Sequence, residues 1–202
     1  MNPADPLPPV LVVMALQQES QGVFEAAGVP VLYTGLGKVN AAIALTRQLA
    51  RYNHQSRPLP LVVNFGTAGS HVHRKGSLLA CHEFMQRDMD VSGLGFEVGV
   101  TPFEDTPALL KFEPVFGHLP AAICGSGDSF VTVQTGSGYT VVDMEAYALA
   151  KVCLLERGNF ACVKYVTDGS DDDAGNDWQK NAHKAAESFL DLYRWLVSHQ
   201  QY

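Results

Sequence analysis

The sequence predicts an α/β fold, a three-layer αβα sandwich around a central, mostly parallel, twisted sheet. Short runs rich in β-branched residues recur along the chain, stretches with a helical repeat separate them, and the runs are almost continuously apolar. Because 47% of the 202 residues are hydrophobic, we expect one sizeable core. We therefore predict a single domain over residues 1–202, in which residues 1–9, with their four prolines, are flexible.

Seven segments are predicted as strands because each is a short apolar run with β-branched residues. They cover residues 10–14, 29–33, 61–65, 77–84, 121–124, 139–142 and 160–167.

Helices are predicted most clearly in 39–49 and 178–197, where apolar residues repeat every three or four positions. Asn176 is the expected N-cap of the last helix, with Gln179 three residues further on. The segment 168–175 is then a loop. The stretch 101–120 mixes prolines and phenylalanines without a period and is predicted to be a packed, irregular loop.

Charge and cysteine content argue against several classes of protein. The 21 acidic residues outnumber 14 scattered basic ones, which disfavours nucleic acid as a partner. The start of the chain has neither a basic run nor a long apolar stretch, so we expect no signal peptide and no membrane span. Four cysteines lie far apart without a C-x-x-C pair, which is typical of reduced core thiols in a cytoplasmic protein.

In an α/β sheet ligands bind at the carboxyl ends of the strands, so residues that follow predicted strands are candidates for a site. Glu19 follows the first strand and could orient a water molecule, or it could merely stabilise the first turn of a helix. Two glycine-rich turns, 34–42 and 64–69, could place backbone N–H groups against a ligand. Tight turns that allow close helix packing explain them equally well.

Three later segments also carry candidate residues. Phe130 follows a glycine-rich turn and could stack on a flat base, although a core phenylalanine after a structural turn is the alternative. Asp143 and Glu145 stand at the start of an apolar helix, where they either have buried partners or simply cap its N-terminus.

Asp168 directly follows a strand and is crowded by further acids. Burial and neighbouring negative charge both raise a carboxyl pKa, as a general acid working near neutral pH requires. A calcium loop over 168–175 is the rival interpretation, but Asp173 stands where such loops need glycine. His71 and His73 have no acid or cysteine at ligand spacing, so we expect neither a metal nor a cofactor.

Five motifs occur in one order along the chain: G-K-V-N-A-A from Gly37, N-F-G-T-A-G from Asn64, G-D-S-F from Gly127, D-M-E-A from Asp143 and T-D at Thr167. In this order they resemble the nucleoside phosphorylase and nucleosidase superfamily, and specifically the 5'-methylthioadenosine/S-adenosylhomocysteine nucleosidases. The resemblance spans about 10–196 and implies a nucleoside phosphorylase-like fold.

The resemblance also implies roles for individual residues. Asp168 would be the acid at the purine and Glu19 the residue that activates water, while Met144 and Glu145 would bind the ribose. Phe130 would stack on the base, and the backbone of Val131 would form a hydrogen bond with its edge. Thr67 would lie beside the ribose and the attacking water, and Trp178 would close the purine side. Phe96 and Pro102 would contact the 5' end of the ligand bound to a partner subunit.

The resemblance implies a purine nucleosidase that forms a homodimer and hydrolyses a 5'-modified adenine nucleoside. Related phosphorylases hold phosphate with arginines, one of them at the position of Asn64, and the carboxylate of Glu19 would repel phosphate, which favours hydrolysis. The alternatives are a purine nucleoside phosphorylase, a futalosine-type hydrolase, or a catalytically weak nucleoside-binding protein. The last is suggested by 101–120 and 131–142, which are both shorter than is usual in the family.

Overall fold

The structure is a computed structural model that describes residues 9–132, 138–171 and 173–199. Residues 1–8 of the segment expected to be flexible lie outside the described residues, as does the middle of the short stretch 131–142.

All seven predicted strands are present, and an eighth was missed. The strands are β1 (Val10–Met14), β2 (Val31–Tyr33), β3 (Leu61–Gly69), β4 (Leu78–Gln86), β5 (Leu109–Lys111), β6 (Ala121–Ser126), β7 (Val141–Asp143) and β8 (Phe160–Asp168). The missed strand, β5, lies inside the predicted irregular loop and pairs antiparallel with β4. Its three residues were too few to give a periodic signal.

The sheet is mixed and closes on itself. The pairs β1–β2, β1–β3, β3–β8, β4–β6 and β6–β7 are parallel, whereas β3–β7, β4–β5 and β4–β8 are antiparallel. Strands β3, β8, β4, β6 and β7 therefore form a ring, and β2 and β1 extend it from β3. Irregularities in β3 at Ala68/Gly69 and in β4 at Cys81/Glu83 fit the bending that closure requires.

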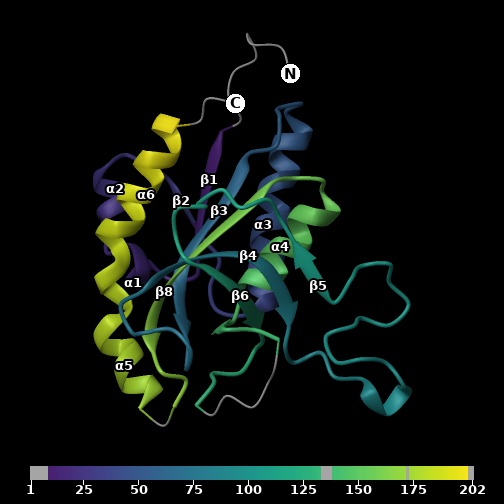
Figure 1. The fold of residues 1–202 in the computed structure, drawn as a ribbon. Coiled ribbons are helices and arrows are strands. Elements are labelled where there is room, and N and C mark those ends of the chain that lie inside the picture. Colours follow the sequence, from purple (N-terminus) through teal and green to yellow (C-terminus); the bar gives the residue numbers. More distant parts are fainter. Residues whose placement is uncertain (1–8, 133–137, 172, 200–202) are drawn as a thin grey trace.

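Helices cover both faces of this sheet, as a sandwich predicts (Figure 1). The helices are α1 (Gln17–Ser20), α2 (Val23–Ala26), α3 (Lys38–His54), α4 (Ala146–Leu155), α5 (Ala174–Asn181) and α6 (Ala186–His199), with short 3-10 turns η1 (Ser92–Leu94) and η2 (Ala182–Ala185). The mixed α/β architecture is confirmed. The expectation of a simple sandwich is corrected, because a strand ring replaces an open central sheet.

Alternate side chains of β1 pack into two different hydrophobic clusters, one on each face of the sheet. Leu11 and Val13 belong to one hydrophobic cluster, together with residues of α3 and α4, whereas Val12 and Met14 belong to another, with Phe24 and residues of α6. Successive side chains of a strand point to opposite faces, so both faces of β1 are buried. This arrangement explains why the run 10–14 is continuously apolar.

The last helical region differs from its prediction. Helix α5 begins after Asp173, so the predicted cap Asn176 lies inside the helix. The expected continuous helix over 178–197 is divided by η2 between α5 and α6. Short alanine-rich sequence at 182–186 allows a change of helix type without disturbing the apolar repeat, and for this reason the pattern did not reveal the break.

The four cysteines are free and buried, which agrees with their interpretation as core residues. None of the helices in the described part of the chain combines the length and the apolar character that a membrane crossing needs.

Candidate active site

One cavity collects most of the residues that the sequence singled out. It lies at the ends of β3, β7 and β8 and beside α1, α5 and the loop after β6, and its volume is about 150 Å³. The predicted residues that line it are Glu19, Thr67, Phe130, Val131, Met144, Glu145, Asp168 and Trp178. Three carboxyl groups that are distant in sequence thus share one hollow.

Glu19 is buried and held by four hydrogen bonds. Its Oε2 accepts from the backbone N–H of Ala15 (3.0 Å) and Leu16 (3.1 Å), and its Oε1 accepts from the backbone N–H (2.8 Å) and the hydroxyl (3.0 Å) of Thr67. The indole N–H of Trp178 donates to the same hydroxyl (3.0 Å). Glu19 therefore stabilises the start of the helix after β1, which was one of the two interpretations of this residue. It also lines the cavity, and its hydrogen bonds fix its orientation.

Glu145 occupies the N-cap position of α4, and the backbone N–H of Gly37 donates to its Oε1 (2.8 Å). In the same glycine-rich turn the N–H of Lys38 donates to Asp128 (2.7 Å). These two backbone groups of the turn 34–42 thus bind carboxylates of the protein itself, which favours the structural explanation of the turn over a phosphate cradle. Burial raises the pKa of Glu145 to about 8, and the nearby charge of Asp143 adds to this effect.

Beneath Glu145 lies a buried ion pair that the sequence analysis did not identify. The ammonium group of Lys164 is 2.8 Å from Asp143 Oδ2, and both side chains are at most 2% exposed. Asp143 also accepts from the hydroxyl of Ser126 (2.5 Å) and caps α4 through the N–H of Ala146 (2.9 Å).

Each member of this pair keeps the other charged. Burial acts to lower the pKa of Lys164, but the charge of Asp143 raises it well above its usual range. Burial acts to raise the pKa of Asp143, but Lys164 and the hydrogen bonds hold it below its usual value. The two groups therefore supply fixed charges beside the cavity.

Asp168 ends β8 and is 3% exposed. The hydroxyl of Thr167 donates to its Oδ2 (2.8 Å) and the N–H of Ser170 donates to its Oδ1 (3.0 Å). Burial is the main cause that raises the pKa of Asp168, with a smaller contribution from the charge of Asp171. The sequence-based expectation of a raised pKa at this position is confirmed in direction.

Two predicted residues do not reach this cavity. Phe96 packs edge-to-face against Phe103 with ring centroids 5.6 Å apart, in a segment that projects from the main body of the fold (Figure 1). Pro102 lies in the same segment, and neither it nor Phe96 lines the cavity. Their predicted contact with a partner subunit's ligand stays a prediction.

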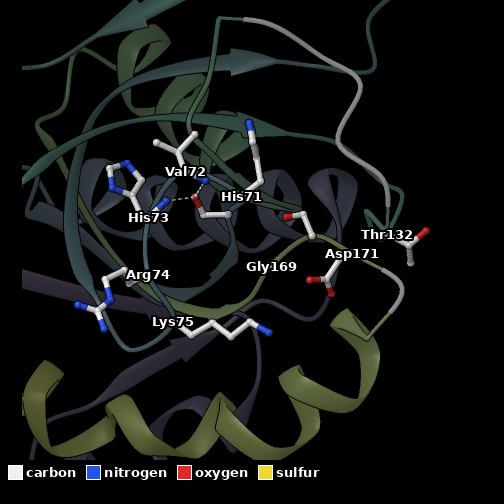
Figure 2. A pocket seen from close by; sticks show the side chains of 10 residues that line it. His71, Val72, His73, Arg74, Lys75, Thr132, Gly169 and Asp171 are labelled. Atoms are coloured by element: carbon white, nitrogen blue, oxygen red, sulfur yellow. Dashed lines mark hydrogen bonds between the residues drawn. The ribbon is translucent and has the colours of Figure 1, made fainter.

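A second, more open cavity of about 750 Å³ adjoins the first. Figure 2 shows that His71, His73, Arg74 and Lys75 line it together with Thr132 and Asp171. The backbone N–H of His73 donates to Ser70 (2.9 Å), which fixes the start of this loop. In the described part of the chain no group of three or more His, Cys, Asp or Glu is arranged to hold a metal ion, so a calcium loop at 168–175 receives no support there.

Sequence reasoning missed Lys164, Arg87, Ser126 and Leu36 as residues in or beside the site. Lys164 had a signal, because a lysine inside the apolar run 160–166 must have a buried partner. Leu36 lies in the glycine-rich turn 34–42, which was a candidate segment although its side chain was not singled out, whereas Arg87 lines the cavity from a loop with no sequence signal.

The chain is a mixed α/β protein with a cavity at the carboxyl ends of its strands, which is where α/β proteins commonly bind small molecules. Among such proteins it resembles the 5'-methylthioadenosine/S-adenosylhomocysteine nucleosidases. The nucleosidase of Marinomonas sp. (strain MWYL1) is 28% identical over 190 residues, which cover 83% of this chain and 79% of the relative. No family model matches the chain.

Solved structures give the same resemblance at the level of the fold. The 5'-methylthioadenosine/S-adenosyl homocysteine nucleosidase of Helicobacter pylori superimposes with a TM-score of 0.84 at 18% identity, covering 96% of this chain and 99% of that one. A futalosine hydrolase mutant of Helicobacter pylori strain 26695 superimposes with a TM-score of 0.83 at 19% identity, over 95% of this chain and 99% of the other. The resemblance inferred from the order of motifs is thereby confirmed.

Proposed function

We propose that the protein is a purine nucleosidase that uses water to hydrolyse the N-glycosidic bond of a 5'-modified adenine nucleoside, such as methylthioadenosine or adenosylhomocysteine. The observation that carries this proposal is the convergence of Glu19, Glu145 and Asp168 on one cavity. The names of the relatives in sequence support the reaction and the substrate class.

Asp168 is proposed as the general acid that donates a proton to N7 of the departing purine. An ordinary aspartic acid, with a pKa near about 3.9, would hold almost no proton at neutral pH. Burial raises the pKa of Asp168 and so enlarges its protonated fraction. General acid catalysis contributes about 10²- to 10⁴-fold, roughly 3 to 5 kcal/mol, so other interactions must supply the rest of the rate enhancement.

Glu145 is proposed to bind the ribose hydroxyls and to stabilise the sugar as its glycosidic bond breaks. Because its pKa is about 8, Glu145 is mainly protonated in the empty site at neutral pH. Positive charge that develops on the ribose favours the ionised carboxylate. The electrostatic interaction is then stronger in the transition state than in the ground state, as catalysis requires.

Glu19 is proposed to accept a proton from the attacking water. The hydrogen bonds from Thr67 and from two backbone N–H groups fix the direction of its carboxylate, which favours a constant water position. Phe130, half-exposed at the cavity, would stack on the base, Val131 would contact the edge of the base, Met144 would contact the ribose and Trp178 would close the purine side.

Hydrolysis is favoured over phosphorolysis by the environment of Asn64. Its amide nitrogen donates to the carbonyl of Val13 (3.1 Å), its carbonyl accepts from the thiol of Cys162 (3.4 Å), and it does not line the cavity. Asn64, at the position where related phosphorylases have a phosphate-binding arginine, is thus hydrogen-bonded to neighbouring strands of the sheet.

The proposal includes a single domain over residues 1–202, cytoplasmic localisation and a homodimer. The four free cysteines support a reducing compartment. Leu94 and Phe103 are 73% and 96% exposed on the projecting segment that carries Phe96 and Pro102, and large exposed apolar groups of this kind favour an interface. The cavity, at about 150 Å³, is smaller than the roughly 300 Å³ usual for ligand sites, so a bound nucleoside would extend beyond it.

The test is to incubate the protein with methylthioadenosine, adenosylhomocysteine, futalosine, adenosine and inosine, with and without phosphate, and to identify both products. We expect free base and a free ribose sugar, at a rate independent of phosphate. Ribose 1-phosphate would identify a phosphorylase, and tight binding without base release would identify a nucleoside-binding protein.

A further inference from the structure

The charges that line the active-site cavity are unevenly distributed. Its ionisable side chains are those of four acids, Glu19, Asp143, Glu145 and Asp168, and one base, Arg87. In the described part of the chain no carboxylate lies within ion-pair distance, 4.0 Å, of the Arg87 guanidinium. Arg87 thus brings to the cavity a positive charge that forms no direct ion pair with the described residues.

Neutral backbone and hydroxyl oxygens hold Arg87 in place. Its Nη2 donates to the carbonyl groups of Gly127 (3.1 Å) and Ser129, and its Nη1 donates to the hydroxyl of Ser129 (3.2 Å). A Cβ at Gly127 would lie 2.8 Å from the Arg87 Cζ, so glycine is what admits the guanidinium. These contacts fix the group without neutralising it, and within the described residues they leave one Nη1 proton and the buried Nε–H without an acceptor.

The neighbouring acid, Asp88, forms its hydrogen bonds with groups other than Arg87. Asp88, the next residue, pairs with the ammonium group of Lys38 (2.5 Å) and accepts from the backbone N–H of Asp128 (2.9 Å). A ligand that places an acceptor near Arg87 would therefore meet a donor that is hydrogen-bonded only to neutral oxygens of the described residues.

Arg87 and Asp168 lie at opposite sides of the cavity. Arg87 follows β4 and Asp168 ends β8, and in the strand ring the path β6, β7, β3 separates the ends of these two strands. The direct pairing of β4 with β8 is confined to 78–81, at the other end of β4. A nucleoside whose base contacts Asp168 would direct its sugar substituent toward Arg87.

We propose that Arg87 binds an oxyanion, a carboxylate or a phosphate, that the substrate carries on the ribose side, and so selects nucleosides with an anionic 5' substituent. This inference rests on the proposed nucleosidase function and adds a specificity to it. Arginine presents its N–H donors in a planar fork that matches both oxyanions, and charge-assisted hydrogen bonds are the stronger ones.

The test compares two substrates of equal size, 5'-carboxymethylthio-5'-deoxyadenosine and its uncharged carboxamide. For the wild-type protein we expect kcat/KM for adenine release to favour the carboxylate by about 10- to 100-fold. Arg87→Met should abolish this ratio, Arg87→Lys should retain part of it, and the control Arg194→Met, at an exposed arginine of α6, should leave it intact. If Arg87 only anchors the 127–129 loop, Arg87→Met will lower both rates equally and the wild-type ratio will be near one, which overturns the proposal.

Two further measurements distinguish an oxyanion on the substrate from free phosphate, and a failure of the Arg87 proposal from a failure of the proposed function. If inorganic phosphate accelerates base release and yields ribose 1-phosphate in an Arg87-dependent way, the anion is a free co-substrate and the proposal is wrong. If no nucleoside is cleaved, the proposed function is wrong, and calorimetric Kd values of the same ligand pair then test Arg87 by itself. A carboxylate preference that Arg87→Met removes supports the anion site, and equal Kd values for the two ligands overturn it.

Discussion

Glu145 and Asp168 are both buried carboxyl groups whose pKa values are raised mainly by burial, but their surroundings differ. Glu145 depends on distant parts of the chain, because the N–H of Gly37 donates to it and the charge of Lys164, which pairs with Asp143, influences its pKa. The hydrogen bonds that Asp168 accepts come from its neighbours in sequence, Thr167 and Ser170. The contrast indicates that the environment of the proposed proton donor is made by one strand end and its loop, whereas the environment of the carboxyl group proposed to bind the sugar depends on several strands of the ring.

The largest effect is expected at the Asp168 end. Asp168→Asn should lower kcat for base release by about 10²- to 10⁴-fold, because the amide cannot donate the proton that the leaving purine needs. Asp191→Asn, which removes an exposed carboxylate of α6 that does not line the cavity, is the control and should stay near the wild-type rate. Steady-state kinetics with methylthioadenosine measure both variants. A near-wild-type rate in Asp168→Asn would remove the residue from the acid role.

At the Glu145 end the corresponding test is on stability. Lys164→Met leaves Asp143 buried without its cation, which should lower the free energy of unfolding by about 3 to 5 kcal/mol. The double variant Lys164→Met, Asp143→Asn keeps the size of the side chain and removes the stranded charge but replaces one acceptor oxygen by an amide donor, so it should recover part of the loss. Urea denaturation measures both. If the single and double variants were equally unstable, packing of the lysine and not its charge would be the cause.

Glu145 itself should make stability depend on pH. Its folded-state pKa is about 8, above the usual 4.5, so burying it costs nothing below pH 4.5 and destabilises the folded state progressively as the pH rises toward 8. Glu145→Gln removes this cost and should be more stable than the wild type at pH 8 by a few kcal/mol, at most about 5, but not at pH 4.5. Glu113→Gln, at an exposed site, serves as the control. A stability difference that stays constant across this pH range would show that the Glu145 pKa is not raised.

The same contrast explains how much of the molecule the sequence could predict. Seven strands and the position of Asp168 followed from local signals, because apolar runs and the residue after each run are neighbours along the chain. The closure of the sheet could not be predicted, since it depends on β3 pairing with both β7 and β8, two contacts between segments far apart in sequence.

Within the site, too, the sequence did not predict contacts between residues that are far apart along the chain. The motif order brought together Glu19, Glu145 and Asp168 correctly, but spacing alone did not identify Lys164 as the partner of Asp143 or Arg87 as a cavity residue. The break at η2 and the early start of α5 were missed because alanine-rich sequence fits either helix type. Interactions set by tertiary structure were therefore the ones that a pattern could not give.

The smallest predicted effects come from two serines, Ser126 beside Asp143 and Ser170 beside Asp168. The hydroxyl of Ser126 donates to Asp143 (2.5 Å) and accepts from the N–H of Tyr147 (2.8 Å), whereas the buried hydroxyl of Ser170 has no hydrogen-bond partner among the residues that the structure describes. Removal of a satisfied hydroxyl leaves two buried polar groups unpaired, so Ser126→Ala should cost about 1 to 3 kcal/mol, while Ser170→Ala should change stability by less than about 0.5 kcal/mol. Urea denaturation of the two alanine variants measures the difference, and each is the matched control of the other. Equal losses would contradict the contrast between the two ends, because the Asp168 loop would then depend on side-chain hydrogen bonding as much as the Asp143 end does.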